Sequence, residues 1–315
     1  MKKIFILGFA VLSFAACVQD QVMETPRGDA IAFDGAFVDN ATRSAYDPST
    51  KTTSLTAFDV WGFVKEYDGT VFFDQDVTFN GSSWEYMGTQ FWAPNQPYYF
   101  TALAPMNSEN VIESLATEDA AKLGLGTIEF TNVDGTEDLL YASASVITNG
   151  PSEPNDPVKF QFKHLLSKVK FTFKNGFLTD NVFVKVNNIK MIAPAKGSID
   201  LAQVDYSKAW TLENKTITLN FGDVEKLSYG MEAECAQERL SLPASSAYLY
   251  NITFDVELYI ETQSVYKVSM TSAVAGVELE MGKAYNFIAE INPNNLDLAA
   301  ITFDVIEVDQ WTPAL

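Results

Sequence analysis

The chain has 315 residues, of which 47% are hydrophobic, and its formal net charge at pH 7 is −20. A chain this acidic is a poor partner for nucleic acid and for anionic lipid surfaces. It contains only two cysteines, Cys17 and Cys235, so its stability has to come from packed cores and not from a disulfide framework.

The first residues are typical of an exported protein. Two lysines precede an apolar run from Ile4 to Phe14 that is too short to span a bilayer, and small residues lead from there to Cys17. This pattern predicts a bacterial lipoprotein signal peptide over residues 1–16, with acyl chains such as palmitate on Cys17 that hold the protein to a membrane. An ordinary signal peptide with an incidental cysteine is the alternative.

The stretch AIAFDGAFVDNATR, from Ala30 to Arg43, predicts a short half-buried strand that ends in polar residues and a lone arginine. The residues predicted to share its apolar face are Ile31, Phe33 and Phe37. A near-copy, AITFDV, stands at residues 300–305, and ITFDV recurs at residues 252–256. Because a match of a few residues is common among inward-facing strands, the likeness alone indicates little.

The rest of the chain predicts an all-β protein with a few short helices. Short runs rich in β-branched and aromatic residues alternate with turn residues, which is typical of β-sandwiches. Three prolines within residues 151–157 cannot join a sheet ladder and predict a linker. The expected organisation is a pro-segment at 17–43, an N-terminal β-sandwich at 44–150 and a C-terminal β-sandwich at 158–315.

The sequence offers little catalytic chemistry. The single histidine, His164, reads as a structural residue at a strand kink, and no nucleophile-elbow motif accompanies it. A zinc site lacks histidine and cysteine ligands. The acidic run from Asp134 to Asp138 departs from a calcium-binding loop and favours a solvated turn over a cation site. We therefore expect no enzyme, no metal and no cofactor.

Several aromatic residues are candidates for a glycan-stacking platform. They are Trp84, Trp92, Tyr98 and Tyr99. Sandwich cores also use such residues, and the core is the favoured interpretation.

Six features, taken in order along the chain, resemble the fimbrillin family, the subunits of type V pili of Bacteroidales bacteria. They are the lipoprotein signal ending at Cys17, the Thr42-Arg43 pair, FDVWGF at Phe58–Phe63, YYFTALAP at Tyr98–Pro105, FKHLLSKVKFTF at Phe162–Phe173 and MGKAYNFIAEI at Met281–Ile291. Each pattern is degenerate, but together they sample nearly the whole chain.

The resemblance implies two tandem transthyretin-like β-sandwich domains and a route of assembly. The subunit is exported as a lipoprotein to the cell outer membrane, anchored there through Cys17. An Arg-specific protease then removes the first strand. A strand from another pilin subunit refills the groove, which builds a cell-surface fimbrium that supports adhesion.

Carried onto this sequence, the resemblance assigns the protease cut to the bond between Arg43 and Ser44. Arg27 is the rival site, but a cut there leaves the strand in place. The removable strand carries Ile31, Phe33 and Phe37, and the donor strand carries Ile301, Phe303 and Val305. The alternatives are a monomeric surface glycan-binding lipoprotein, or an anchor or tip subunit of the same pilus.

Overall fold

A computed structural model describes residues 29–39, 55–64, 69–113, 126–150, 152–201, 210–297 and 301–308. Within these residues the protein is almost entirely β-structure, and the only helix is the short α2 (Pro293–Asp297). None of the described helical structure is long and apolar enough to cross a membrane. The predicted all-β fold class is confirmed.

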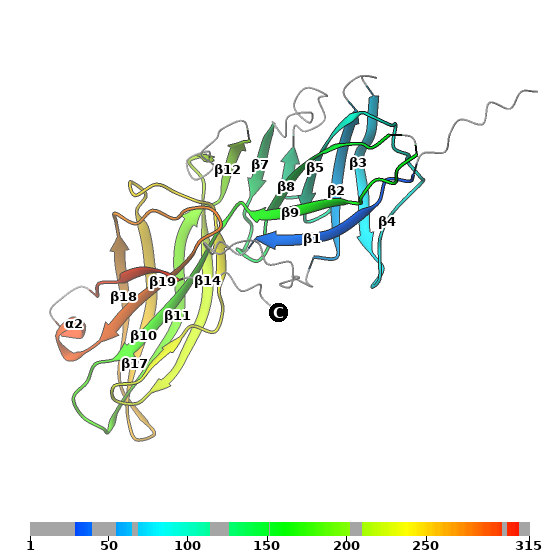
Figure 1. The fold of residues 1–315 in the computed structure, drawn as a ribbon. Helices are drawn as coiled ribbons and strands as arrows, with labels where there is room; N and C mark the ends of the chain where they lie inside the picture. Colours follow the sequence, from blue (N-terminus) through cyan, green and yellow to red (C-terminus); the bar gives the residue numbers. More distant parts are fainter. Residues whose placement is uncertain are drawn as a thin grey trace, which may run out of the picture.

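The largest sheet in the described part of the chain has seven strands and lies at one end of an elongated molecule (Figure 1). Its spatial order is β1-β9-β8-β5-β2-β3-β4, so the first strand of the chain lies at one edge. The strands are β1 (Phe33–Asp39), β9 (Val158–His164), β8 (Leu140–Ile147), β5 (Pro97–Ala104), β2 (Ala57–Val64), β3 (Gly69–Phe79) and β4 (Trp84–Tyr86).

A second sheet joins the two halves of the sequence. Its described strands, in order, are β13 (Trp210–Leu212), β12 (Lys196–Asp200), β7 (Thr127–Thr131) and β6 (Val111–Glu113). Strand β12 pairs antiparallel with β7, so a strand from the second half of the chain lies beside strands from the first half.

Two further sheets lie at the other end of the molecule. In the described residues one has the order β14-β11-β17-β18, with β14 (Thr216–Leu227), β11 (Val182–Pro194), β17 (Tyr250–Ile260) and β18 (Gln263–Val274). The other has the path β15-β10-β19-β20, and β16 also pairs with β10. Its strands are β15 (Glu232–Glu234), β10 (Ser167–Asn175), β19 (Ala284–Ile291), β20 (Asp304–Val308) and β16 (Arg239–Ser241).

Simple alternation of apolar and polar residues explains most of these strands. In β9, VKFQFKH, the residues Val158, Phe160 and Phe162 are buried and the lysines and glutamine between them are exposed. Strand β2 is buried on both faces, because its alternate residues serve two cores. Phe58 and Val60 pack in one cluster, while Trp61 and Phe63 pack in another.

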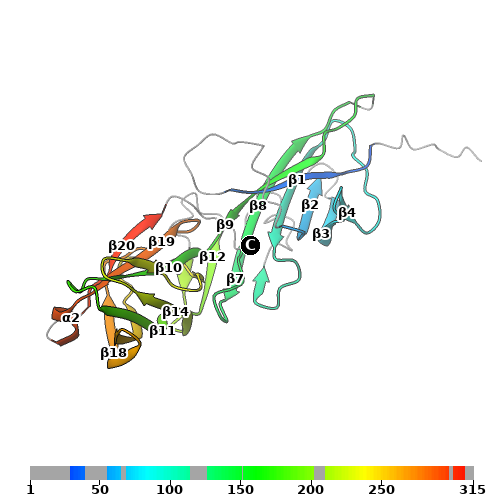
Figure 2. The same cartoon turned by 90° about the horizontal axis from the view of Figure 1, so that it is seen from below.

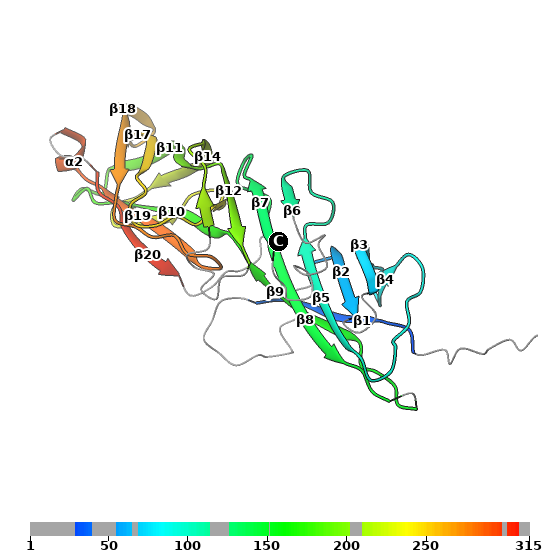
Figure 3. The ribbon, with the colours of Figure 1, turned by 90° about the horizontal axis from the view of Figure 1, so that it is seen from above.

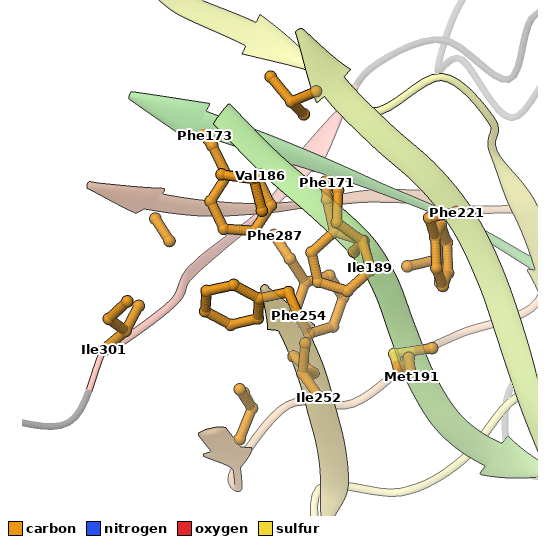
Figure 4. Close-up of a cluster of buried hydrophobic side chains, with 14 of the residues drawn as sticks. Phe171, Phe173, Val186, Ile189, Met191, Phe221, Ile252, Phe254, Phe287 and Ile301 are labelled. Atoms are coloured by element: carbon orange, nitrogen blue, oxygen red, sulfur yellow. The ribbon is translucent and has the colours of Figure 1, made fainter. Parts of the chain in front are cut away.

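In the described part of the chain, the buried hydrophobic side chains form three clusters. The first cluster lies inside the seven-stranded sheet and includes Phe33, Phe58 and Phe160. The second lies where the two halves of the sequence meet and includes residues of β2, β7 and β12. The third fills the sandwich at the other end and includes Phe171, Phe254 and Phe287, as Figure 4 shows.

The predicted domain boundary differs from the sheet topology. Residues 152–157 of the expected linker connect β8 to β9, and these two strands pair with each other at Leu140 and His164. Strand β9, expected to open the C-terminal sandwich, is thus the neighbour of β1 in the first sheet. The prolines mark a long connection within one sheet, because a proline-rich loop and a domain linker share the same local signal.

Candidate functional site

Residues 29–39, which we name the β1 segment, close a gap between the two ends of the seven-stranded sheet (Figure 2). Its first part pairs with the chain that follows β4: the amide of Ile31 donates to the carbonyl of Gln90 at 2.8 Å, and the amide of Trp92 donates to the carbonyl of Asp29 at 3.0 Å. Its second part runs parallel to β9. The segment therefore completes the wall of the first core.

Phe33 lies at the centre of that core. Its side chain is 6% exposed, and its ring stacks on Phe160 with a centroid separation of 5.8 Å. The other rings within 6.4 Å of it are Phe58, Phe72, Tyr86 and Phe100. Ile31 is 2% exposed, and its carbonyl accepts a hydrogen bond of 2.8 Å from the Tyr86 hydroxyl. Burial of these two side chains contributes roughly 1.5–3 kcal/mol each.

The register places Phe37 differently from the prediction. Phe33 is opposite Val158 and Ala36 is opposite Phe160, so β1 has one residue more than β9 between these two pairs. This bulge reverses the alternation, and Phe37 comes to lie opposite Gln161, an exposed residue of β9. An uninterrupted strand was assumed in placing Phe37 on the face of Ile31 and Phe33, and the Asp34-Gly35 pair interrupts it.

Residues 301–308, which we name the β20 segment, have a similar seat at the edge of the third cluster (Figure 3). Ile301 is 2% exposed, and its carbonyl accepts a hydrogen bond of 2.8 Å from the Ser272 hydroxyl. The ring of Phe303 lies within 6.4 Å of Phe171, Phe173, Phe254 and Phe287. Val305 packs against the same cluster and lies opposite Phe287 in the ladder with β19.

The two terminal segments thus share a packing pattern as well as a sequence pattern. In each, an isoleucine is sealed in the wall of the core with its carbonyl bound by a side-chain hydroxyl, and a phenylalanine two residues later fills an aromatic cluster. The third copy, at Ile252 and Phe254, lies instead within the paired strand β17. The sequence could not show the two hydroxyls, because Tyr86 is 55 residues from Ile31 and Ser272 is 29 residues from Ile301.

The predicted lipidation and cleavage residues Cys17, Arg43 and Ser44 lie outside the described residues. The whole chain has three arginines, and the third is Arg239. Arg239 lies in β16, opposite Val169 of β10, and its side chain is half-buried. The peptide bond after Arg239 is therefore held in a sheet, where a protease cannot extend it into an active site.

The other polar candidates have protein partners. His164 is 5% exposed, and its Nδ1 lies 2.6 Å from Oδ2 of Asp138. Hydrogen bonds from Thr136 hold the pKa of Asp134 below its usual value, and Glu137 accepts hydrogen bonds from Ser108 and Asn110. Across the described residues, no group of three or more histidine, cysteine, aspartate or glutamate side chains is placed to hold a metal ion.

One carboxylate of the first sandwich is poorly solvated. Asp59 is 5% exposed, and its Oδ2 accepts a hydrogen bond of 2.8 Å from the amide of Asn107, while Oδ1 has no hydrogen-bond partner among the described residues. Its cross-strand neighbour is Asp76. Burial, followed by the nearby charges of Asp74, Asp76 and Glu113, raises the pKa of Asp59 to about 6.

The aromatic candidates for glycan stacking belong mainly to the core. Trp92 is 4% exposed and Tyr98 is 2% exposed, and they pack edge to face at 4.8 Å. Trp84 is half-buried between Phe58 and Phe79. Tyr99 is half-buried on β5. Rings held in this way do not form an open stacking platform.

The fold places the chain among all-β sandwich proteins, and comparison with known proteins narrows the class. A sequence model described as fimbrillin-like matches residues 42–311, and the chain belongs to this family. The family is one of fimbrial and adhesion proteins of the cell surface and is not an enzyme family. No curated protein matches the chain.

Two solved structures illustrate the likeness of fold. A fimbrial protein from Bacteroides vulgatus has a TM-score of 0.61 at 15% identity, over 90% of this chain and 99% of its own. A candidate cell adhesion protein from Bacteroides ovatus has a TM-score of 0.50 at 15% identity, over 90% of this chain and 98% of its own. At these identities the likeness extends to the fold alone.

Proposed function

We propose that this protein is a pilin of a fimbrium that is exported as a lipoprotein on Cys17, cut after Arg43 and polymerised by exchange of terminal strands. The observation that carries the proposal is the seat of the β1 segment. An edge strand at the start of the chain supplies Phe33 to the centre of a core, so one cut after the strand makes a whole wall of that core removable.

Removal of the β1 segment leaves an open groove. The backbone of β9 loses its neighbour, and the rings of Phe58, Phe100 and Phe160 lose the one that fills the space between them. Such an edge pairs readily with another strand. A segment with the spacing Ile-x-Phe fits, because Ile301 and Phe303 already occupy a comparable seat.

The β20 segment is the proposed donor, and its release has a cost. Ile301 and Phe303 fill their own core, so a donor that leaves its seat opens one apolar groove while it fills another. Exchange of like for like gains little free energy. The drive must come from contacts that the monomer lacks, among them those of Trp311 and Leu315, which follow β20 in the sequence.

The distribution of arginine supports a single productive cut. With Arg239 held in β16, the accessible sites for an Arg-specific protease reduce to Arg27 and Arg43. Only a cut at Arg43 removes the β1 segment, because Arg27 precedes it. Head-to-tail insertion of a donor then generates an open filament.

Limited digestion with an Arg-specific protease tests the proposal. The wild-type chain and the Arg27→Gln variant should yield an N-terminus at Ser44 and filaments in electron micrographs. Arg43→Gln should yield neither. Filaments from Arg43→Gln would overturn the assignment of the cut, and digestion of the wild type to Ser44 without filaments would overturn assembly by strand exchange. An N-terminus at Cys17 on mature surface protein would indicate an anchor subunit instead.

A further inference from the structure

Large apolar side chains are exposed together at the end of the second sandwich farthest from the first. Leu178 is 86% exposed and Met231 is 57% exposed. The set, which we name the distal pole, consists of Leu178, Tyr229, Met231, Ile260, Val265 and Tyr266. They come from the turn after β10, the turn between β14 and β15, and the hairpin of β17 and β18 (Figure 1).

A buried asparagine fixes these turns relative to one another. Asn175 is fully buried, and its Nδ2 donates to the carbonyls of Val182 and Leu227 at 2.9 Å each. Its amide donates to the carbonyl of Met231 at 2.9 Å, and Val182 pairs with Ile260 in the ladder. The distal pole is therefore a preformed surface, and its exposed side chains are not the consequence of loose turns.

The distal pole is also where the route to the donor strand begins. The amide of Gly176 donates to the carbonyl of Ile291 at the end of β19, and α2 follows at Pro293 before the chain returns to β20. If the β20 segment leaves its seat, the released chain emerges here. Residues 298–315 then reach up to about 60 Å when extended.

A second apolar surface lies beside the seat that the donor would enter. Phe91 is 48% exposed and bridges to Ala30, Met87 is 88% exposed, and Phe79 is 40% exposed next to Trp84. These residues, which we name the entry patch, remain on the protein after the β1 segment has gone.

We propose that the distal pole of one molecule docks on the entry patch of a second copy of this chain. The inference rests on the proposed function, because the donor joins the two surfaces. Six half-exposed large side chains offer roughly 500–700 Å², close to the ~800 Å² that each partner buries in a specific interface. This contact is absent from the monomer, so it supplies free energy that strand exchange alone does not.

A second copy is favoured over an anionic membrane because the surroundings of the distal pole are acidic. Asp180, Glu232 and Glu261 are exposed in the same turns. Between two acidic molecules an apolar contact is opposed by charge repulsion, which salt screens. Filament assembly should therefore strengthen as salt is raised from 50 to 500 mM.

The test compares matched serine variants of the protease-cut chain. Leu178→Ser/Met231→Ser should raise the protein concentration needed for half-maximal assembly at least tenfold. The control Ile112→Ser/Val133→Ser removes equally exposed side chains, 64% and 56% exposed, from outside both surfaces and should change it less than twofold. Thermal unfolding of each variant verifies the fold.

The entry-patch variant Met87→Ser/Phe91→Ser closes a double-mutant cycle with the distal-pole variant. If the two surfaces meet, the combined variant assembles little worse than either alone. Independent effects that multiply, normal assembly of the distal-pole variant, or its loss of binding to phosphatidylcholine vesicles would each overturn the contact while strand exchange stands. If the wild-type chain is cut and does not assemble, the proposed function and this contact fail together.

Discussion

The seats of the β1 and β20 segments differ in how each is held, although both present the same Ile-x-Phe spacing to a core. The β1 segment runs parallel to β9 and contains a bulge, and it also bridges to the chain after β4. The β20 segment makes a short, regular antiparallel ladder with β19. A strand that has to leave permanently can carry an irregular register, whereas a strand that has to insert elsewhere benefits from a regular one.

The largest expected effect comes from locking β20 in its own seat. Ile288 and Asp304 lie opposite each other in the β19–β20 ladder, and a cysteine at each position should form a disulfide. The oxidised Ile288→Cys/Asp304→Cys variant, once cut after Arg43, should form no filaments, and reductant should restore them. Asp304→Cys alone is the control. Filaments from the oxidised variant would show that β20 is not the donor.

Removal of the central ring of the first seat should cost nearly as much. Phe33→Ala should lower the free energy of unfolding of the uncut chain by about 3–5 kcal/mol, because it leaves a cavity among Phe58, Phe72 and Phe160. Phe303→Ala should cost less, because Phe303 is only partly buried. Phe73→Ala, on an exposed ring, should change stability by less than about 0.5 kcal/mol in denaturant titrations.

The two sandwiches should respond oppositely to acid, although each has an aspartate after a core phenylalanine. The folded-state pKa of Asp59 is raised to about 6, so the folded protein binds a proton more tightly and gains stability as pH falls from about 6 towards 4. Hydrogen bonds from Ser269 and Asn188 lower the pKa of Asp255, so its contribution is present above its ordinary pKa and is lost in more acidic solution.

Thermal unfolding between pH 7.5 and 4.5 measures the difference. Asp59→Asn should remove the gain on acidification, which amounts to roughly 2–3 kcal/mol, and it should stabilise the protein at pH 7.5. Asp255→Asn should leave the slope in this range unchanged. A wild-type melting temperature that falls steadily between pH 6 and pH 5 in parallel with Asp59→Asn would contradict the assignment.

The smallest expected effects are those of the two hydroxyls that bind the isoleucine carbonyls. Tyr86→Phe and Ser272→Ala should each cost about 1 kcal/mol, since each leaves one carbonyl without this donor. After the cut at Arg43, Tyr86→Phe should matter only through the inserted donor. A loss in the uncut chain that disappears in the cut monomer would sharpen the comparison, and equal losses in both forms would break it.

The sequence was sufficient for the fold class and for the buried faces of regular strands such as β9, where alternation is strict. It was insufficient where distant parts of the chain meet. Nothing local marks β9 as a partner of β1 or β12 as a partner of β7, because long-range pairing leaves no signal in a single strand. The bulge that shifts Phe37 was also hidden, since Asp34-Gly35 reads equally well as part of a strand or as an interruption.

The two terminal segments were recognised by their letters, but the letters alone assigned no role. Their likeness became informative when the structure placed Ile31 and Ile301 in equivalent seals and Phe33 and Phe303 in aromatic clusters. The cost of releasing Ile301 from its own core followed from the structure alone, and it changes the expected energetics of assembly.

The N-terminal residue of subunits within assembled filaments tests the central claim most directly. Filaments are isolated, dissociated and sequenced from the N-terminus, with intact mass as a check. If the β1 segment is a temporary plug, the subunits begin at Ser44 and contain no residue of the range 29–39. Filament subunits that retain Ile31 and Phe33 would contradict the account, because the first seat would then still hold its own strand.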